Sequence, residues 1–526
     1  MFKKKNCVLR YKIFYILLVF LANTNFAQQL FQFNDAYTRY KTDRYINKNQ
    51  IETHTAFKPL LKRYVPEVDS IVFEKGRDSK IISKLKHPKW WQKLRTEDLL
   101  LINEDGFYLA INPVFDFSQG KDNLDSNISI NTRGISIKGN LGKKVSFKSD
   151  FYENQAFFPQ FIREYSLNHR VVPGQGRLRG FKTWGFDYAN ASGYLSYSPA
   201  KWLNISLGHG KHFIGEGYRS LLLSDQSFNY PYLKFMFQSK KWQYIFMLTS
   251  FQAAQTADTR MLVYNRKHGS FLYLNYIFNK YFQAGLFEGV MFKTSGSGYN
   301  NRFPAMFFVP VIFSRSIAYG LDNEHNVLLG INGKLSPLKS IQLYGQFALD
   351  DAKLNKYAYQ TGVKFFDFLW LKNLYLQMEY NFVRPYTYSH IDVQQNWSFY
   401  NEAFAASPGT GFTEKIIIAS YRLNDFIISF KMNDIYSSTE TADENYGINI
   451  FKPDNTASTG IKTSKIASNN PVSKKYYHYK ISYLVNPATN FQVFFEYTQR
   501  KLTGIPDEYY YFFGIKTQLR NLYYDY

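Results

Sequence analysis

The most informative absence in this 526-residue chain is that of cysteine. Cys7 is the only cysteine, and it lies in the basic N-terminal stretch that we predict to be removed on export. The exported chain would then have no cysteine, which excludes both disulfide bonds and thiolate metal sites. We therefore expect an exported protein that no disulfide stabilises.

Long apolar runs are also missing. The run Ile13–Ala22 has ten apolar residues, whereas a membrane-spanning helix needs about 20, and no other stretch comes close. Five basic residues precede this run, and Ala27 follows it as a candidate cleavage point. This order is typical of a secretory signal peptide. We predict that residues 1–27 are a signal peptide; the alternative is an uncleaved anchor.

Motifs of catalysis and of nucleic-acid binding are absent as well. The sequence has no G-x-S-x-G or H-E-x-x-H motif, and no helix-turn-helix, zinc-finger or RNA-binding motif. Carboxylate pairs such as Asp350–Asp351 occur, but sequence does not fix the separation that a glycosidase needs. We expect no catalytic residue, no cofactor and no nucleic-acid partner.

Aromatic residues, in contrast, are abundant. They make up 19% of the chain, with 44 Tyr and 49 Phe, yet the mean hydropathy is −0.35. Outer-membrane β-barrels combine these properties because their strands alternate lipid-facing apolar residues with lumen-facing polar ones, between two aromatic girdles. The net charge of +23 becomes +18 without the five basic residues of the signal. This charge favours anionic neighbours, such as lipopolysaccharide phosphates or acidic glycans.

One unit recurs from Phe107 onward: a strand, a very short turn and a second strand. In the clearest case, strands Tyr479–Val485 and Asn490–Arg500 flank the turn Asn486–Thr489, whose residues favour hairpins. Eight such hairpins are predicted, at Asn127–Asn154, Ala191–Gly210, Tyr232–Phe251, Ser270–Phe292, Val327–Asp351, Tyr359–Phe382, Thr413–Asn433 and Tyr479–Arg500. Single strands at Phe107–Ser118 and Glu508–Leu519 bring the total to about 18, and an even number allows an antiparallel barrel to close.

The sequence thus predicts an all-β fold, a closed antiparallel transmembrane barrel over residues 107–526. Residues 28–106 come before it and have partly helical spacings in Leu30–Asn47 and Trp90–Asn103. We expect them to form a short periplasmic segment ahead of the barrel. Long loops alternate with the short turns and are expected outside the cell: Gln155–Asn190, Lys211–Pro231, Lys293–Asn326, Val383–Phe412 and Asp434–Lys475.

The segment Gly208–Asp225, GHGKHFIGEGYRSLLLSD, has four glycines within ten residues and follows the alternating strand Leu203–Leu207. Glycine lets the backbone turn inward, so we expect this segment to lie inside the barrel or to cap it. Its charged side chains would then pair with residues of the wall. Its candidate lumen or glycan-binding residues are His209, His212, Glu216, Tyr218, Arg219 and Asp225.

Other interpretations of this segment are weaker. His209, His212 and Glu216 could converge on a metal ion only in a bent loop, because strand residues three apart face opposite sides; histidines hydrogen-bonded within the lumen are favoured. The glycine spacing is not G-x-G-x-x-G and no helix follows, which argues against nucleotide binding. Arg219 could pair with Asp225 across the loop or contact an acidic sugar, and we favour the pair.

A second group of candidates lies near the start of the barrel. The apolar alternation changes phase between Ile130 and Ile135, so Arg133 and the glycine after it are predicted to form a β-bulge. Glu153 and Asn154 stand at the head of a long loop among aromatic residues. This composition suits sugar contact, although polarity at the barrel rim is the simpler explanation. Arg133, Glu153 and Asn154 are therefore added to the candidates.

Five segments carry a resemblance to a known family. They are NTRG (Asn131–Gly134), YENQAFFPQF (Tyr152–Phe161), GHGKHFIGEGYRSLLLSD, LDNEHNVLLG (Leu321–Gly330) and, after Tyr386–His390, YNEAFAASPG (Tyr400–Gly409). In this order they resemble the Wzi family of capsule-assembly outer-membrane proteins, and especially its gliding-motility relative RemB. The resemblance implies an 18-stranded barrel associated with surface polysaccharide, and Asn323 joins the candidates. Phe404–Gly411 departs from the family pattern.

The leading hypothesis is a non-enzymatic outer-membrane barrel whose long loops bind surface polysaccharide, in capsule or exopolysaccharide assembly or attachment and in gliding motility. The expected partners are the outer membrane and its lipopolysaccharide, the polysaccharide, and other cell-surface or motility proteins. The alternative is a porin or transport channel for anionic or sugar solutes. A third class is an outer-membrane hydrolase or lipid-modifying enzyme. A lumen filled by Gly208–Asp225 would favour the first hypothesis over the channel.

Overall fold

The structure is a computed structural model. It describes residues 30–31, 36–64, 94–95, 97–124, 126–253, 265–293, 295–296, 299–300, 303–321, 325–441, 443–467, 469–517 and 521–526. The predicted signal peptide, residues 1–27, lies outside the described residues. In the part that is described, no helix is long and apolar enough to cross a membrane.

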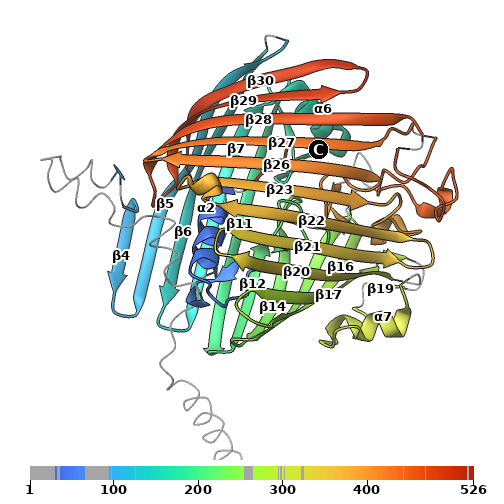
Figure 1. Ribbon diagram of the computed structural model, residues 1–526, viewed down its shortest axis with the longest axis horizontal. Coiled ribbons are helices and arrows are strands. Elements are labelled where there is room, and N and C mark those ends of the chain that lie inside the picture. The colour runs from blue at the N-terminus through green and yellow to red at the C-terminus, as the bar shows by residue number, and fades with distance from the viewer. Residues whose placement is uncertain are drawn as a thin grey trace, which may run out of the picture.

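Eighteen antiparallel strands form a closed barrel (Figure 1). In barrel order they are β5 (Phe107–Asp122), β6 (Asn127–Leu141), β7 (Val145–Phe157), β11 (Gly185–Ala200), β12 (Leu203–Gly210), β14 (Tyr230–Gln238), β15 (Trp242–Ala253), β16 (Asn265–Ile277), β17 (Phe282–Lys293), β20 (Asn326–Leu338), β21 (Ile341–Asp351), β22 (Lys356–Phe366), β23 (Leu374–Val383), β26 (Phe412–Leu423), β27 (Phe426–Ser438), β28 (Pro471–Asn486), β29 (Phe491–Leu502) and β30 (Ile505–Lys516). β30 pairs with β5 and closes the ring. The predicted fold class and strand number are confirmed, and each predicted hairpin is present.

Strand alternation explains why these sequences form a barrel. On β29, Val493 and Phe495 are 47% and 46% exposed on the outside, whereas Phe494 between them is buried in the lumen. Tyr483 and Ile481 of β28 lie opposite the two exposed residues in register, so apolar side chains pair across the strands on the outer face. A continuous apolar exterior results.

Two short strands extend the sheet beyond the ring. β4 (Leu100–Glu104) pairs with β5, and β10 (Arg179–Phe181) pairs with β11. The helical pattern predicted over Trp90–Asn103 is therefore wrong for its last four residues, because pairing with the edge of β5 overrides the local helical spacing. The sheet also begins at Leu100, seven residues before the predicted start of the barrel.

The remaining elements are short and belong to the loops or to the N-terminal segment. They are β1 (Leu30–Phe31), α2 (Ala36–Lys48), β2 (Phe57–Lys58), β3 (Leu60–Leu61), η1 (Lys62–Tyr64), α6 (Gln160–His169), β8 (Val171–Val172), β9 (Gly176–Arg177), β13 (Phe213–Ile214), β18 (Ser295–Gly296), β19 (Tyr299–Asn300), η3 (Ala305–Phe308), α7 (Ser314–Tyr319), η4 (Phe368–Trp370), η5 (Val393–Gln395), β24 (Ser398–Phe399), β25 (Glu402–Ala403) and η6 (Asp454–Thr456). The long loops gather at one end of the barrel, on the right in Figure 1, together with the short turns after β5, β21 and β29, whereas the connections at the other end are all short. We call these the loop end and the turn end.

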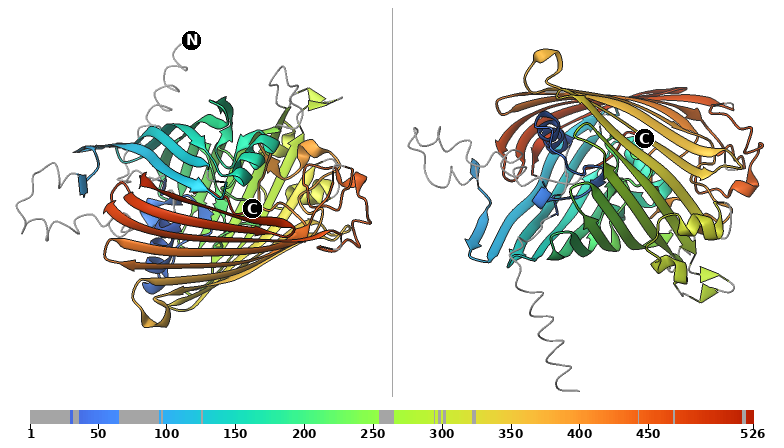
Figure 2. Two further views of the ribbon diagram at one scale, coloured as in Figure 1. Left: turned by 90° about the horizontal axis from the view of Figure 1, so that it is seen from above. Right: turned by 60° about the horizontal axis from the view of Figure 1, so that its bottom comes forward.

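The N-terminal segment enters the barrel at the turn end instead of lying ahead of it. α2 sits within the ring of strands (Figure 2). Its Asn47 side chain donates hydrogen bonds to the carbonyls of Leu338, the last residue of β20, and of Lys339, in the turn that follows. Arg44 pairs with Asp367, just after β22. The described part of the segment that we expected before the barrel thus closes its turn end from inside.

The glycine-rich segment fills the middle of the lumen, as the sequence predicts. The side chains of Leu221, Leu222 and Leu223 are fully buried and belong to the main apolar cluster, together with wall residues such as Phe271 and Phe287. Residues 521–526 also lie inside the ring, in contact with this segment (Figure 2). Three parts of the chain that are distant in sequence therefore occupy one lumen.

The contact between Leu222 and Gly330 of β20 provides a test of this packing. A Cβ atom at Gly330 would lie 2.2 Å from Leu222 Cδ2, and the fully buried leucine has no space into which to move. We expect Gly330→Val to lower the free energy of unfolding by about 1–3 kcal/mol, measured by denaturation in detergent. Gly333→Val on the same strand is the control, since a Cβ there meets nothing within 4 Å. Equal losses in the two variants would contradict the packing.

Candidate functional site

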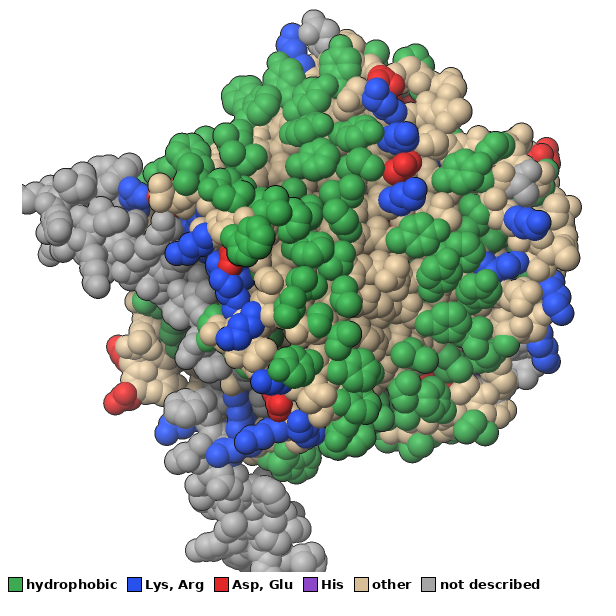
Figure 3. Space-filling model, in the orientation of Figure 1, with side chains coloured by type: hydrophobic (Ala, Val, Ile, Leu, Met, Phe, Trp, Pro, Cys, Tyr) green, Lys and Arg blue, Asp and Glu red, His purple; other side chains and the backbone are tan. Residues whose placement is uncertain are grey.

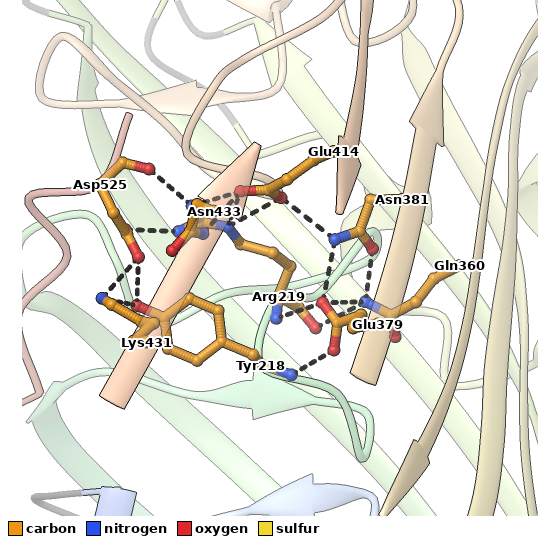
Figure 4. Close-up of polar contacts among 9 residues, drawn as sticks. All are labelled: Tyr218, Arg219, Gln360, Glu379, Asn381, Glu414, Lys431, Asn433 and Asp525. Carbon is orange, nitrogen blue, oxygen red and sulfur yellow. Dashed lines mark hydrogen bonds and ion pairs between the residues drawn. The ribbon is translucent and has the colours of Figure 1, made fainter. Parts of the chain in front are cut away.

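A buried ion-pair network around Arg219 joins the lumen segment to the wall and to the C-terminal tail (Figure 4). The Arg219 side chain donates to Glu414 Oε1 of β26 at 2.7 Å and to Asp525 Oδ1 of the tail at 3.1 Å. It also donates to the backbone carbonyl of Asp525 at 2.8 Å. Arg219 and Glu414 are 1% and 0% exposed. One guanidinium thus fixes both a barrel strand and the end of the chain.

A second carboxylate, Glu379 of β23, binds the backbone of the same segment. Its side chain accepts hydrogen bonds from the backbone N–H groups of Tyr218, at 2.6 Å, and of Arg219, at 3.0 Å. The Tyr344 hydroxyl and the Asn381 amide donate to it from the wall at 2.8 and 2.9 Å. Both carboxylate oxygens of Glu379 accept hydrogen bonds, so this buried group is satisfied and binds the backbone of the loop.

Electrostatics keep Arg219 and Asp525 charged although both side chains are buried. Burial by itself opposes the charge of Arg219, but Asp525 and Glu414 hold the pKa of Arg219 well above its ordinary value. Burial likewise opposes the charge of Asp525, yet Arg219 and Lys431 hold the pKa of Asp525 at about 2. Lys431 Nζ donates to Asp525 Oδ2 at 2.6 Å. The pair between Arg219 and Asp525 is thus an ion pair at neutral pH.

The predicted pair between Arg219 and Asp225 is wrong. Asp225 accepts a hydrogen bond from the Tyr523 hydroxyl at 2.7 Å, whereas Arg219 pairs with residues 195 and 306 positions away. The side chains of Arg219 and Asp225 therefore bind different partners. Tyr218 also contacts the tail, since its hydroxyl donates to Asp525 at 2.6 Å.

Glu216 connects the lumen segment to the N-terminal segment. Its carboxylate accepts a hydrogen bond from the Thr55 hydroxyl and lies 3.8 Å from Lys58 Nζ. The backbones also pair, since β13 forms two register pairs with β2 and Gly215 N–H donates to the Ala56 carbonyl at 2.9 Å. Lys58 also donates to the Gly215 carbonyl. Burial opposes the charge of Glu216, but Lys58 and Lys334 lower the pKa of Glu216. We call the segment Phe213–Ser224 the plug. The N-terminal segment thus holds the plug in place.

The two histidines of the segment lie on opposite sides of the wall. His209 is on the outer face of β12, where its Nδ1 lies 3.1 Å from the Ala191 carbonyl. His212 is buried in the lumen, with Nδ1 3.2 Å from the Tyr230 hydroxyl and Nε2 3.3 Å from Lys234 Nζ. Among the described residues, no group of three His, Cys, Asp or Glu side chains is arranged to hold a metal ion.

The candidates of β6 and β7 also separate between the two faces. Arg133 and Glu153 lie opposite each other in register and are exposed on the outer face. Asn154 faces the lumen, where it accepts a hydrogen bond from Thr132 at 2.7 Å and donates one to the Tyr188 carbonyl at 3.1 Å. Asn323 lies outside the described residues.

The predicted β-bulge at Arg133 is wrong, because β6 runs in unbroken register with β5 and β7. The phase change has another cause. Ile128 and Ile130 point into the lumen, where they join an apolar cluster under α6 that includes Phe161 and Phe494. Ile135 points outward and is 42% exposed. Apolar residues face inward here because the lumen is filled.

A cavity of about 330 Å³ remains beside the plug. It lies toward the turn end and is lined by Tyr218, Tyr476, Tyr524 and Asn154, among others. This volume is at the lower limit of the roughly 300–1,000 Å³ of small-molecule pockets. The plug and the tail form part of the wall of this cavity and so limit its extent.

At the loop end, the loop between β7 and β11 presents a basic and aromatic surface. Residues 158–184 contain five Lys and Arg residues and a single acidic residue, Glu164. The cations are Arg163, Arg170, Arg177, Arg179 and Lys182, and all except the half-buried Arg163 are exposed. Arg163 lies 5.4 Å above the Trp184 ring, and Lys182 lies 5.2 Å from the Phe181 ring. We call residues 158–184 the basic loop.

Comparison with known proteins identifies the fold. The chain has the fold of Wzi from Escherichia coli. That structure, described as a carbohydrate-binding β-barrel and an outer-membrane protein involved in group 1 capsule assembly, superposes with a TM-score of 0.55 at 11% identity, over 93% of this chain and 99% of Wzi. No family model and no curated protein matches the sequence. The Pseudomonas aeruginosa proteins OpdK (TM-score 0.44, 8% identity, 78% and 98% of the two chains) and OprD (0.42, 9%, 77% and 94%) are more distant.

The structure adds partners that the sequence did not indicate. Glu379, Glu414 and Asp525 are the carboxylates that hold the plug, and Lys58 and Thr55 are its contacts with the N-terminal segment. Strand alternation assigns Glu379 and Glu414 to the lumen face of their strands. It does not indicate which loop they meet, because that depends on how the loops fold inside the ring.

Hydrogen bonds that include one to Glu402 connect three loops at the loop end of the plug. Glu402 is 5% exposed and accepts a hydrogen bond from the Gly174 N–H of the basic loop at 2.6 Å. Lys211, just ahead of the plug, donates to the Gly174 carbonyl at 2.7 Å. The backbones of Ser224 and Phe404 are also bonded at 3.0 Å. The loop end is thereby fastened to the plug.

Removal of the central cation should loosen the plug and the tail together. In Arg219→Ala, Glu414 and Asp525 stay buried without this partner, and breaking a buried ion pair typically costs about 3–5 kcal/mol. We expect a lower melting temperature and faster removal of residues 521–526 by carboxypeptidase. Arg177→Ala, an exposed arginine, is the control and should change neither. An Arg219→Ala variant with the melting curve and digestion rate of the parent would contradict this role.

The stability of the loop end should depend on pH through Glu402. Burial raises the pKa of Glu402 to about 8, against the opposing effects of the Gly174 amide and Lys211, whereas an unfolded glutamate titrates near pH 4.3. The folded protein therefore keeps a proton that the unfolded chain loses. This contribution is complete below about pH 4 and is lost as the pH rises through about 8.

Glu402→Gln should therefore flatten the fall in melting temperature between pH 5 and pH 9. The exposed Glu164→Gln on α6 should leave that slope unchanged. Parallel slopes for the parent and Glu402→Gln would show that Glu402 does not hold the proton.

Proposed function

We propose that this protein is an outer-membrane barrel, closed to solute flow, that holds an acidic surface polysaccharide on its loop end. The observation that carries the proposal is the occupied lumen. The segment Phe213–Ser224 spans it with buried side chains, and the N-terminal segment and the tail are bonded to it. A barrel built in this way serves as a rigid base for loops.

The exterior supports placement in a membrane. Large apolar side chains cover most of the face seen in Figure 3. On the barrel strands, Leu343, Phe347, Met378 and Ile428 are each 40% or more exposed. Such a surface is unstable in water and matches the apolar band of an outer-membrane barrel. The likeness in fold to the E. coli outer-membrane protein Wzi agrees with this placement.

The character of the plug disfavours a transport channel. A gate must open at a modest free-energy cost, whereas this plug combines a fully buried apolar cluster with buried ion pairs to three other parts of the chain. The buried carboxylates Glu379, Glu414 and Asp525 are all engaged in holding the chain. Their use as structural partners also disfavours a hydrolase.

The basic loop is the surface best suited to an acidic polysaccharide. The loop exposes four cations, of which Lys182 lies beside the Phe181 ring, and the half-buried Arg163 lies over the Trp184 ring. Sugars bind by stacking on aromatic rings and by pairing their acidic groups with arginine. A polysaccharide offers many such groups, so weak contacts add up through multivalency. Carbohydrate binding by Wzi is consistent with this role. Retention of an exopolysaccharide in this way would also serve gliding motility.

Removal of two cations of the basic loop tests the proposal. Arg177→Ala/Arg179→Ala should weaken binding of the host's surface polysaccharide roughly threefold to tenfold, since an exposed ion pair contributes about 0.2–1 kcal/mol. The effect should shrink as the salt concentration rises. Binding is measured with purified protein in nanodiscs by biolayer interferometry. The matched control, Lys339→Ala/Lys372→Ala, removes two exposed cations at the turn end and should bind as the parent does.

Two results would overturn the proposal. Equal polysaccharide binding by the parent, the basic-loop variant and the control would remove the loop end as the binding surface. Large, steady conductance of the intact protein in planar bilayers would support the channel instead, because the proposed function requires the plug to block the flow of solutes.

A further inference from the structure

The loop between β17 and β20 contains a segment that lies on the outside of the barrel. Phe287 and Met291 of β17 point into the lumen cluster, so Glu288 and Val290 between them point outward, by strand alternation. Residues 303–320, which include η3 and α7, pack against this outer face. We call them the strap, and Figures 1 and 2 show α7 outside the ring of strands.

A buried ion pair fastens the strap to the wall. Glu288 accepts hydrogen bonds from the backbone N–H groups of Phe313 and Ser316 at 2.9 and 2.8 Å. Arg315 lies 3.5 Å from the Glu288 carboxylate, and both side chains are 0% exposed. The Arg315 guanidinium also donates to Ser270 Oγ of β16 at 2.7 Å. A charged pair on the outer wall is thus completely enclosed by the strap.

Apolar and polar contacts continue this attachment on both sides. Phe307 of η3 is buried against Val290, Phe292 and Val327. The Tyr244 hydroxyl of β15 donates to the Pro310 carbonyl at 2.7 Å. The strap therefore covers four neighbouring strands, β15, β16, β17 and β20, and adds a second layer to the wall.

The opposite side of the strap is apolar and exposed. Phe303, Phe308, Val311 and Ile317 are 48%, 53%, 57% and 83% exposed. A segment that only shielded Glu288 in water would turn polar side chains outward. Beyond the strap, the uncovered wall is also apolar, with Ile331 of β20 52% exposed. The strap thus continues the apolar exterior.

A glutamate on the outward face of a membrane barrel needs such a cover. A carboxylate facing lipid tails is costly unless it is paired and hydrogen-bonded. The strap supplies Arg315 and two backbone N–H groups to Glu288, and it covers this carboxylate with a layer whose outer side chains are apolar. An apolar outer side is favourable only where the strap itself contacts lipid.

We propose that the strap is a membrane-binding element. It lies in the leaflet at the loop end, with the side chains of Phe303, Phe308, Val311 and Ile317 among the lipid acyl chains. The pair Glu288–Arg315 holds it against the wall. The inference rests on the membrane placement in the proposed function and is independent of polysaccharide binding.

Single-cysteine labelling tests the inference, because Cys7 is the only cysteine and a Cys7→Ser background offers no other thiol. Ile317→Cys is labelled with an environment-sensitive fluorophore and reconstituted in phosphatidylcholine vesicles. Asn455→Cys, an exposed position in the loop between β27 and β28, is the matched control. We expect nitroxide on the acyl chains to quench the label at position 317 and aqueous iodide to quench it at least threefold less than at position 455.

Two outcomes overturn the proposal. Equal iodide quenching at the two positions would place the strap in water. Protection from both quenchers, together with disulfide cross-linking between Ile317→Cys chains, would assign the apolar surface to a second copy of the protein. Polysaccharide binding is measured on the same vesicles, so that failure of the proposed function is recognised separately.

The role of the ion pair is tested in the labelled background. Arg315→Ala leaves Glu288 buried without its cation, and the strap should detach, which raises iodide quenching at position 317 to the level of position 455. The double variant Glu288→Gln/Arg315→Met, which removes both charges, should keep the label protected from iodide. Continued protection in Arg315→Ala would contradict the fastening by this pair.

Discussion

The structure depends on one geometric constraint, namely that eighteen strands enclose more space than their own inward-facing side chains can fill. The chain resolves this by placing three of its own segments inside the ring. The segment Phe213–Ser224 occupies the middle, α2 closes the turn end, and residues 521–526 are bonded to the first of these segments. Every other feature of the lumen follows from this filling.

Filling the lumen requires charges to be buried, and the chain pairs them. Arg219 is held between Glu414 of the wall and Asp525 of the tail, and Glu216 is held by the N-terminal segment. Buried ion pairs contribute little to stability compared with apolar packing, but an unpaired partner is very unfavourable. Such pairs therefore select a single arrangement of the segments, while Leu221–Leu223 and the surrounding aromatic residues contribute most of the apolar burial.

A buried charge is also paired on the outer face of the barrel. There, Glu288 forms an ion pair with Arg315 and is enclosed by the strap, whose own outer side is apolar. The basic loop, in contrast, exposes Arg170, Arg177, Arg179 and Lys182 to solvent, and Lys182 lies beside the Phe181 ring. The loop end thus combines surfaces of two kinds, an apolar one on the side of the barrel and a basic one above it. Lipid suits the first and an acidic polymer suits the second.

The barrel could be predicted from the sequence because strand alternation and turn residues are local properties. They predicted each hairpin, the number of strands and the inward path of the glycine-rich segment. The partners of the buried side chains, in contrast, depend on the tertiary structure. Arg219 does not pair with nearby Asp225, the isoleucines before Arg133 face inward without a bulge, and α2 of the N-terminal segment lies in the lumen. The physical reason is that these contacts join residues up to several hundred positions apart, and ring closure, not local pattern, brings them together.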